Sequence, residues 1–529
     1  MKTTKMVPAF ICFLLLLNVL PATADVRLPA IFGDGMVLQQ KAKAPIWGWA
    51  EPGEKIYIKG SWQWTGTSTT ADKDGNWLTK IKTPKAGGPF TISIAGKNKI
   101  IFKDVLIGEV WICSGQSNMG LSLSYSANAQ NEIAAANYPN IRFFNVNMTI
   151  ADKPQKDCVG SWSQCTPETA AELSAAAYYF GRQLHQELNV PIGLIHASKG
   201  GSPAEAWIRK EVLEAEPDFA SILERFAKGV ADFPLAKQEY AQKLEEWTQA
   251  VNKAKADHTP IPSKPYVLQM EQTGPGHYQS PSCLYNGMIA PLVPYRIRGV
   301  IWYQGECNSW RAWQYRKLFP AMIANWRDDW GQGQFPFYYV QIASFDYSIF
   351  DNGIEEPIVP ELREAQTMAL NVPDTGMAVT MDISDINNIH PENKQDVGKR
   401  LALWALAKTY GHKNIVYSGP LYKSMAIEQK TENSKPAIRL FFDHVGSGLT
   451  TKGGKLTDFT IAGEDGKFVE ANAEIDNNTI VVSSEKVRNP VAVRYAWTNT
   501  AMPNLFNKEG LPASSFRTDD WPCVTANRK

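Results

Sequence analysis

The chain has 529 residues, enough for two or three domains of roughly 100–200 residues each. Its 44% hydrophobic and 20% charged residues are the composition of an ordinary globular protein. The 54 basic and 53 acidic residues leave a net charge of +1, so nothing favours a polyanionic partner. Nucleic acid is therefore not an expected partner.

Residues 1–24 have the pattern of a secretory signal peptide. Lys2 and Lys5 precede an apolar run over 6–20, and Ala22-Thr23-Ala24 is a small-residue cleavage site. The run is too short for a membrane span, and no later segment reaches the required length. We expect an exported protein, periplasmic or secreted, with no membrane span.

Seven cysteines occur in the chain, and Cys12 lies within the predicted signal peptide. Export permits disulfides, and Cys158 and Cys165 are close enough in sequence to close a loop. Cys113 lies in an apolar run typical of a buried strand, so we expect a free thiol there. No Cys-x-x-Cys spacing occurs, and a zinc site is not expected.

Three segments follow the signal peptide. Residues 25–104 contain short period-two strands and turn residues, which predict a small β-sandwich. Residues 105–416 alternate strands and helices, which predicts a parallel sheet with helices on both faces. Residues 417–529 return to β patterns and predict a C-terminal β domain. In the middle segment the predicted strands are 110–113, 192–197, 299–303, 337–342 and 377–381, and the predicted helices are 171–188, 311–330, 361–370 and 394–410.

A segment rich in Lys, Glu and Ala interrupts the middle domain at about 209–260. Its composition predicts a helical insertion. A solvated pair of helices is the simpler interpretation, and a lid over the substrate is the alternative.

Residues 108–120, Gly-Glu-Val-Trp-Ile-Cys-Ser-Gly-Gln-Ser-Asn-Met-Gly, are the most informative stretch. The apolar run 110–113 predicts a strand buried on both faces, and Gly115 permits a tight turn after it. Ser117 then lies between this strand and the next element, which we predict to be a helix. Ligands of parallel sheets bind at strand carboxyl ends, and a helix N-terminus there offers N–H groups to an oxyanion. Ser117 is therefore a candidate nucleophile.

Three further predicted strands end in glycine-containing or polar loops. Gly200 and Gly201 let a backbone N–H approach a ligand, Gln304 can donate its amide, and His390 can accept the proton of Ser117. Because strand ends of a parallel sheet meet at one edge, we expect these groups to converge. The polar residues assigned to substrate binding or to holding these loops are Gln116, Asn118, Glu306, Asn308 and Asn388.

These stretches resemble the sialate O-acetylesterase family, a carbohydrate-esterase branch of the SGNH hydrolases. The matching runs are 108–119, 193–207, 284–292, 297–306 and 389–395, and the resemblance covers nearly the whole chain after residue 24. It implies an α/β fold of the SGNH-hydrolase (flavodoxin-like) type. In that fold a three-layer core with a parallel sheet is flanked by N-terminal and C-terminal β-sandwich-like domains.

The resemblance also implies a serine esterase that removes O-acetyl groups from sugars and needs no metal or organic cofactor. Ser117 would attack the acetyl carbonyl and His390 would take its proton. The N–H groups of Ser117 and of Gly200 or Gly201, with the Gln304 side chain, would form the oxyanion hole. Water would then hydrolyse the acetyl-serine intermediate.

The third member of the triad is the main departure from the family. Relatives commonly carry an acidic residue two or three positions before the histidine, where this chain has Asn388 and Asn387. We assign Asp385 to this role, with Asp382 as an alternative. An Asn carbonyl that orients the imidazole, or a Ser–His dyad helped by a backbone carbonyl, are the other solutions.

Three functions remain at this point. The first is an exported sugar O-acetylesterase acting on sialic acid esters. The second is an acetylesterase for plant polysaccharides such as xyloglucan or xylan, because these enzymes share the same motifs. The third is a carbohydrate-binding protein with a degenerate site, suggested by the two asparagines and the two β domains.

Overall fold

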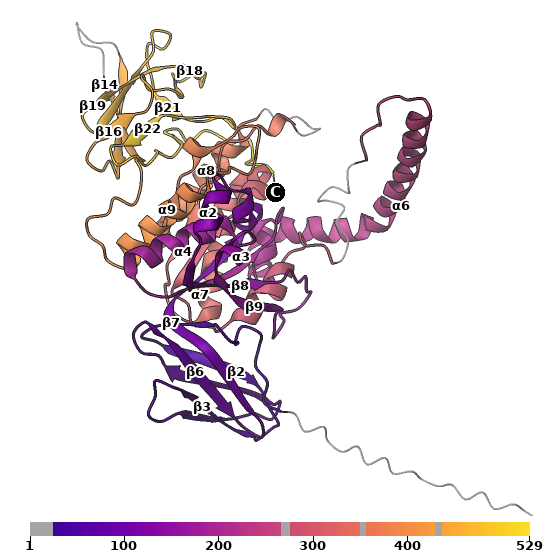
Figure 1. Ribbon diagram of the computed structural model, residues 1–529. Helices are drawn as coiled ribbons and strands as arrows, with labels where there is room; N and C mark the ends of the chain where they lie inside the picture. Colours follow the sequence, from indigo (N-terminus) through magenta and orange to yellow (C-terminus); the bar gives the residue numbers. More distant parts are fainter. Residues whose placement is uncertain (1–24, 266–275, 350–355, 429–435, 529) are drawn as a thin grey trace, which may run out of the picture.

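Three parts of the chain follow one another along the molecule, with the N-terminal strands at one end, an α/β body in the middle and the C-terminal strands at the other end (Figure 1). The computed structural model describes residues 25–265, 276–349, 356–428 and 436–528. The predicted signal peptide, residues 1–24, lies outside the described residues.

The N-terminal part consists of two antiparallel arrangements that share one core. β2 pairs with β5, while β3 pairs with β4 and β6, and β6 pairs with β7. Alternate residues such as Ile46, Ile56 and Ile81 are fully buried between them, as period-two patterning predicts. The strands are β1 (Val37–Gln39), β2 (Lys43–Trp49), β3 (Lys55–Gly60), β4 (Thr67–Thr70), β5 (Asn76–Lys82) and β6 (Gly87–Ala95).

Strand β7 (Lys99–Gly115) belongs to both the N-terminal part and the body. Its first half pairs with β6, and its second half pairs with β10 (Ile192–Ser198) and β11 (Gly299–Tyr303). Its burial changes accordingly, from alternating to continuous from Val105 onward. The predicted boundary between 104 and 105 therefore falls inside one continuous strand.

The body is a mixed α/β unit around a mainly parallel sheet of order β13-β12-β11-β7-β10-β8-β9. Only β9 runs antiparallel to its neighbour in this sequence of strands. All five predicted strands are present, and β8 and β9 are additional. The strands are β8 (Tyr138–Val146), β9 (Gly160–Cys165), β10 (Ile192–Ser198), β11 (Gly299–Tyr303), β12 (Phe337–Val340) and β13 (Thr375–Ala378).

Helices cover both faces of the sheet, as the alternation predicted. On β7, Trp111 and Cys113 join the core under α4 and α9, whereas Val110 and Ile112 join the core under α7 and α8. The four predicted helices are all present, although the last one ends in a π-helical turn, Ala405–Thr409. The α-helices of this layer are α4 (Ala175–Leu188), α7 (Ala312–Trp330), α8 (Ile358–Met368) and α9 (Lys394–Trp404), and the shorter ones are α1 (Ser117–Gly120), α2 (Ala129–Ala135) and α3 (Pro167–Ala170).

The predicted insertion is a short helix, α5 (Lys210–Ala215), followed by one long helix, α6 (Ala220–Ala256). The expected helical insertion is thus present as two helices of very different length. Pro234 lies inside α6, where its missing N–H favours a bend, and the distal half turns away from the body in Figure 1. Few of its side chains are buried, which fits its Lys/Glu-rich composition.

The C-terminal part is again antiparallel, with β15 and β20 as the inner strands of its four-stranded sheet. Its last residues return to the body, where the backbone N–H groups of Val524 and Thr525 donate to the Glu361 carboxylate of α8. The strands are β14 (Leu421–Glu428), β15 (Ala437–Asp443), β16 (Leu449–Thr451), β17 (Phe459–Ala462), β18 (Val469–Glu470), β19 (Asn472–Asp476), β20 (Thr479–Ser483), β21 (Ala492–Tyr495), β22 (Leu505–Asn507) and β23 (Phe516–Arg517).

The cysteines of the described residues are free thiols. The suggested Cys158–Cys165 disulfide is therefore absent, and both thiols are buried separately. The Cys113 thiol is fully buried in the core, as predicted. In the described ranges, no helix is both long and apolar enough to cross a bilayer.

Candidate active site

Ser117 follows the carboxyl end of β7 at the centre of the parallel sheet and begins the single turn α1. Gly115, which ends the strand, has φ +141°, and a Cβ there would lie 2.2 Å from the Tyr303 carbonyl oxygen. Only glycine fits this turn. The ends of β10 and β11 flank the same residue, because both Ser198 and Tyr303 pair with Gly115.

His390 faces this serine from the loop before α9. Its Nε2 lies 2.8 Å from the Ser117 Oγ, which is hydrogen-bonding distance. Both side chains are half-buried, so the pair is accessible to a ligand while partly shielded from water. The predicted nucleophile and base, 273 positions apart in the chain, are thus brought together by the fold.

The structure does not bring the predicted acid to this histidine. Asp385 is exposed and caps its own turn by accepting from the Asn387 N–H at 2.9 Å. Asp382 forms a bidentate ion pair with Arg400, in which both N–O distances are 2.7 Å. Within the described part of the chain, no carboxylate hydrogen-bonds to the His390 ring.

Asn388 holds the backbone beside His390 instead. Its side-chain oxygen accepts from the His390 N–H at 2.9 Å. Burial, and secondly the positive charge of Lys394, lower the pKa of His390 below the ordinary value. This direction agrees with a ring that has no anionic partner, and the arrangement is a Ser–His dyad.

The predicted oxyanion glycines lie against the nucleophile. A Cβ added to Gly200 would be 3.4 Å from the Ser117 Cβ, so the two backbones are in close contact. Gly201 follows with φ +69°, a left-handed conformation. The Gly201 carbonyl oxygen accepts from the Gln279 amide at 2.8 Å, which fixes the orientation of this loop.

Gln304 is fully buried and its polar atoms are occupied by protein groups. Its amide nitrogen donates to the Asn308 side chain at 2.7 Å and to the Ser202 carbonyl at 3.3 Å. Its oxygen accepts from the Tyr315 hydroxyl at 3.0 Å. These bonds use both amide hydrogens, so this conformation leaves no Gln304 donor for an oxyanion.

The residues predicted to bind substrate or hold loops do the latter in this structure. Gln116 accepts from the backbone N–H groups of Gly305 and Cys307 at 3.2 and 3.3 Å. Asn308 accepts from the Ala204 N–H at 2.9 Å and donates to the buried Glu205 carboxylate, also at 2.9 Å. The loops after β7, β10 and β11 are tied together by these buried amides.

Asn118 and Glu306 connect the histidine loop to the same network. The Asn118 amide nitrogen donates to the Glu306 carboxylate at 2.6 Å and to the Ile389 carbonyl at 3.0 Å. The Asn118 oxygen accepts from the Lys394 ammonium at 2.6 Å. The residue directly before His390 is therefore anchored to the residue directly after Ser117.

Comparison with known proteins identifies the family. A family described as carbohydrate esterase, sialic acid-specific acetylesterase, matches residues 107–256 and 273–407. The chain is 31% identical to rat sialate O-acetylesterase over 89% of each chain, and 30% identical to the human protein of that name over 95% of this chain and 94% of the relative. The chain belongs to the sialic acid-specific acetylesterase family of carbohydrate esterases. It is accordingly a carboxylic ester hydrolase that acts on acetylated carbohydrates.

A solved structure extends the similarity beyond the family segment. A carbohydrate acetylesterase from Xanthomonas citri superposes with a TM-score of 0.77 at 34% identity, covering 94% of this chain and all of that chain. The N-terminal and C-terminal β parts are therefore shared with another carbohydrate esterase.

Lys394, for which the sequence predicts no role, is completely buried beside the dyad. Besides its bond to Asn118, its ammonium lies 5.1 Å from the centre of the Tyr303 ring. Burial lowers the pKa of Lys394 to about 7, opposed by the charge of Glu306. Its position four residues after His390 was the available signal, but lysines at helix starts are usually solvated.

Lys199, next to the oxyanion glycines, was also missed. Its ammonium lies 4.5 Å from the centre of the Tyr278 ring, and the Tyr278 hydroxyl would be 3.1 Å from a Cβ on Gly201. The charge of Lys199 also contributes, after burial, to the lowered pKa of His277. Salt bridges within the described ranges do not include Lys199. Among the described residues, a cation therefore lies beside the candidate site without a carboxylate partner there.

No group of three or more His, Cys, Asp or Glu side chains that could hold a metal ion occurs among the described residues.

Proposed function

We propose that this esterase hydrolyses O-acetyl esters of sialic acids through an acetyl-serine intermediate. The observation that carries the mechanism is the 2.8 Å contact between the Ser117 Oγ and the His390 Nε2 at the end of the central strand. A hydroxyl bonded to an imidazole in this way loses its proton as it attacks a carbonyl. The same geometry, with the parallel sheet behind it, supports an SGNH-hydrolase fold.

The acylation half begins with attack by Ser117 on the acetyl carbonyl carbon, while the proton passes to His390 Nε2. The resulting oxyanion lies toward the N–H groups of Ser117 and of Gly200 or Gly201. When the C–O bond to the sugar breaks, His390 gives its proton to the departing sugar oxygen. Water then repeats the sequence on the acetyl-serine and releases acetate.

An acidic substrate is favoured by Lys199. Sialic acids carry a carboxylate, whereas the acetylated sugars of xylan and xyloglucan backbones are neutral. A cation 4.5 Å from the Tyr278 ring, beside the glycine loop, can pair with that carboxylate. This residue is the reason to prefer the sialate reaction to the plant-polysaccharide alternative. Membership of an esterase family argues against the third alternative, a non-catalytic carbohydrate-binding protein.

We also propose that the protein is exported, on the pattern of residues 1–24. The test of function is acetate release from O-acetylated sialic acid and from an acetylated xylo-oligosaccharide, by wild type and by Ser117→Ala. We expect release from the first substrate and a loss of about 10³-fold or more in the variant. Release from the xylo-oligosaccharide alone would support the esterase mechanism but show that the substrate is a plant polysaccharide and not a sialic acid. Release that persists in Ser117→Ala would contradict the proposed nucleophile.

A further inference from the structure

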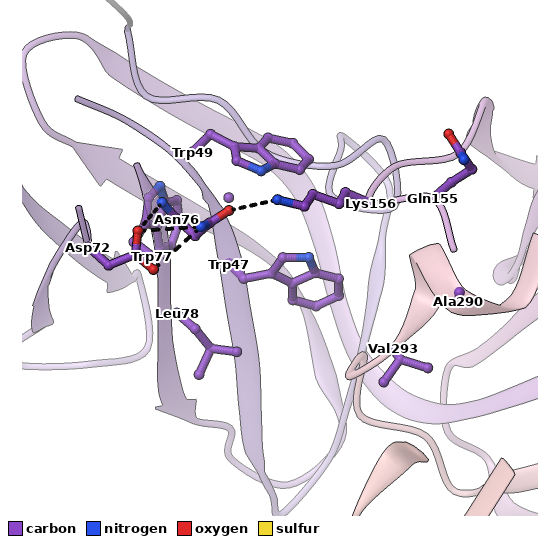
Figure 2. A pocket seen from close by; sticks show the side chains of 11 residues that line it. Trp47, Trp49, Asp72, Asn76, Trp77, Leu78, Gln155, Lys156, Ala290 and Val293 are labelled. Atoms are coloured by element: carbon purple, nitrogen blue, oxygen red, sulfur yellow. Dashed lines mark hydrogen bonds between the residues drawn. The ribbon is translucent and has the colours of Figure 1, made fainter. Parts of the chain in front are cut away.

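A pocket between the N-terminal β part and the body has the composition of a carbohydrate subsite. Its volume is about 340 Å³, within the range of small-ligand pockets, which often form between domains. Figure 2 shows Trp47, Trp49 and Asn76 on its N-terminal side and Lys156 reaching in from the body.

The two tryptophans share one face of β2, because they are two positions apart on a strand. In the pairing with β5 they stand opposite Leu78 and Asn76. Both indoles are half-buried. Trp47 is held in place by Phe32, with ring centres 4.7 Å apart, and Trp49 by the Arg27 guanidinium, 5.9 Å from its ring. Half-buried, fixed indoles present a rigid apolar surface at little entropic cost.

The side chains of Lys156 and Asn76 make only long polar contacts in the pocket, whereas the Asp72 carboxylate is fixed by the backbone N–H groups of Asp74 and Asn76 at 2.9 and 2.8 Å. The Lys156 ammonium lies 3.4 Å from the Asn76 side-chain oxygen, and the Asn76 amide nitrogen lies 3.4 Å from both Asp72 oxygens. Sugar hydroxyls can replace such long contacts with shorter ones. One carboxylate and one ammonium cancel in charge, so the pocket favours a neutral ligand.

The pocket is remote from the dyad. Its lining includes no residue of the dyad or of the loops after β7, β10 and β11. On the body side it includes Ala290 and Val293, which precede the amino end of β11 at Gly299, whereas the dyad lies beyond the carboxyl ends of the sheet strands. The five residues of β11 alone span roughly 16 Å. One sugar ring cannot occupy both places. A glycan bound here is either a distant unit of the substrate or a separate chain.

From these observations we propose that the pocket formed by Trp47, Trp49, Asp72, Asn76 and Lys156 binds a neutral pyranose unit of a glycan. The apolar face of the ring stacks on an indole, and its hydroxyls bond to Asn76, Asp72 and Lys156. The site anchors the esterase to glycans and takes no part in the acetyl transfer. It therefore stands independently of which acetyl ester is cleaved.

The test is isothermal titration of the Ser117→Ala protein with two neutral oligosaccharides, lacto-N-neotetraose and xylohexaose. We expect at least one of them to bind. Trp49→Ala and Asn76→Ala, each added to Ser117→Ala, should weaken that binding about tenfold or more. The matched control is Trp64→Ala, because Trp64 is on the same β part but 94% exposed and outside the pocket.

Thermal unfolding of each variant verifies that the N-terminal part is folded. If Trp49→Ala lowers the unfolding temperature markedly, the binding measured with Asn76→Ala alone tests the proposal. That substitution removes a polar contact and leaves the hydrophobic core intact. The proposal is overturned if neither oligosaccharide binds, if the folded pocket variants bind as well as the parent, or if Trp64→Ala weakens binding equally.

Discussion

Replacing Asn388 by Asp places a carboxylate beside the histidine of the dyad. The Asn388 oxygen already accepts from the His390 N–H at 2.9 Å, and an aspartate can keep that bond. Its charge would lie roughly 6 Å from the imidazole, which at an effective dielectric constant of about 40 corresponds to about 1.4 kcal/mol. That energy raises the pKa of His390 by about one unit.

The sign of the effect on activity follows from the role of the base. In the proposed mechanism neutral His390 is the active form, so we expect kcat/KM to rise with pH through its pKa. Because burial and Lys394 lower the pKa of His390, the acidic limb of the wild-type profile should lie below pH 6.5. Asn388→Asp should move this limb up by about one pH unit and, because the imidazolium is better stabilised, raise the plateau by up to tenfold.

The assay is the pH dependence of kcat/KM for 4-nitrophenyl acetate between pH 4 and 9. Asn387→Asp is the matched control, because it adds the same charge at an exposed neighbouring position, where water screens it. It should shift the limb less. An unchanged limb and plateau in Asn388→Asp would refute the reasoning, since they would mean that His390 already has an anionic partner.

Two further predictions concern buried and half-buried lysines. Lys199→Gln should lower kcat/KM for O-acetylated sialic acid, relative to kcat/KM for 4-nitrophenyl acetate, by about tenfold, mainly through KM. Lys199→Arg keeps the positive charge and should retain most of this preference. An unchanged ratio in Lys199→Gln would exclude carboxylate recognition by Lys199. Lys394 has a pKa of about 7 in the folded state against an ordinary value of 10.5. Between pH 7 and 10.5 its amine is therefore protonated in the unfolded state but neutral in the folded state. The free energy of unfolding of wild type relative to Lys394→Met should therefore rise with pH from about 7 to 10.5, by roughly 5 kcal/mol at most. Denaturant unfolding at several pH values measures this difference, and the exposed Lys399→Met should show no such trend. A difference for Lys394→Met that does not change with pH would contradict the lowered pKa.

The strands that the sequence predicts are those with an apolar pattern in their own residues. The runs at 110–113, 192–197 and 299–303 are apolar apart from the half-buried His196 and lie at the centre of the sheet, buried on both faces. β8 begins Tyr-Pro-Asn and β9 reads Gly-Ser-Trp-Ser-Gln-Cys. Neither has a regular apolar pattern, because both lie toward the edge of the sheet. Pairing with β10 makes β8 a strand, and that partner is distant in sequence.

The candidate site was predictable where a topological rule applies. Strand ends of a parallel sheet meet at one edge, so the sequence alone places Ser117 and His390 at one edge of the sheet. The state of Gln304 was not predictable, because Asn308, Ser202 and Tyr315 decide it through side-chain geometry. Lys394 was missed for a similar reason: a lysine is buried only when distant partners, here Asn118 and Glu306, compensate its charge.

The dyad shows how an esterase can lack an acid at the usual place. In a triad the acid orients the imidazole, fixes its tautomer and stabilises the imidazolium. Here orientation comes from the backbone, because Asn118 holds the Ile389 carbonyl and Asn388 holds the His390 N–H. Stabilisation of the imidazolium has no such substitute, and Lys394 opposes it. In the proposed mechanism we therefore expect a base that stays neutral, and so accepts a proton, at lower pH than a carboxylate-paired histidine would, with a lower maximal rate.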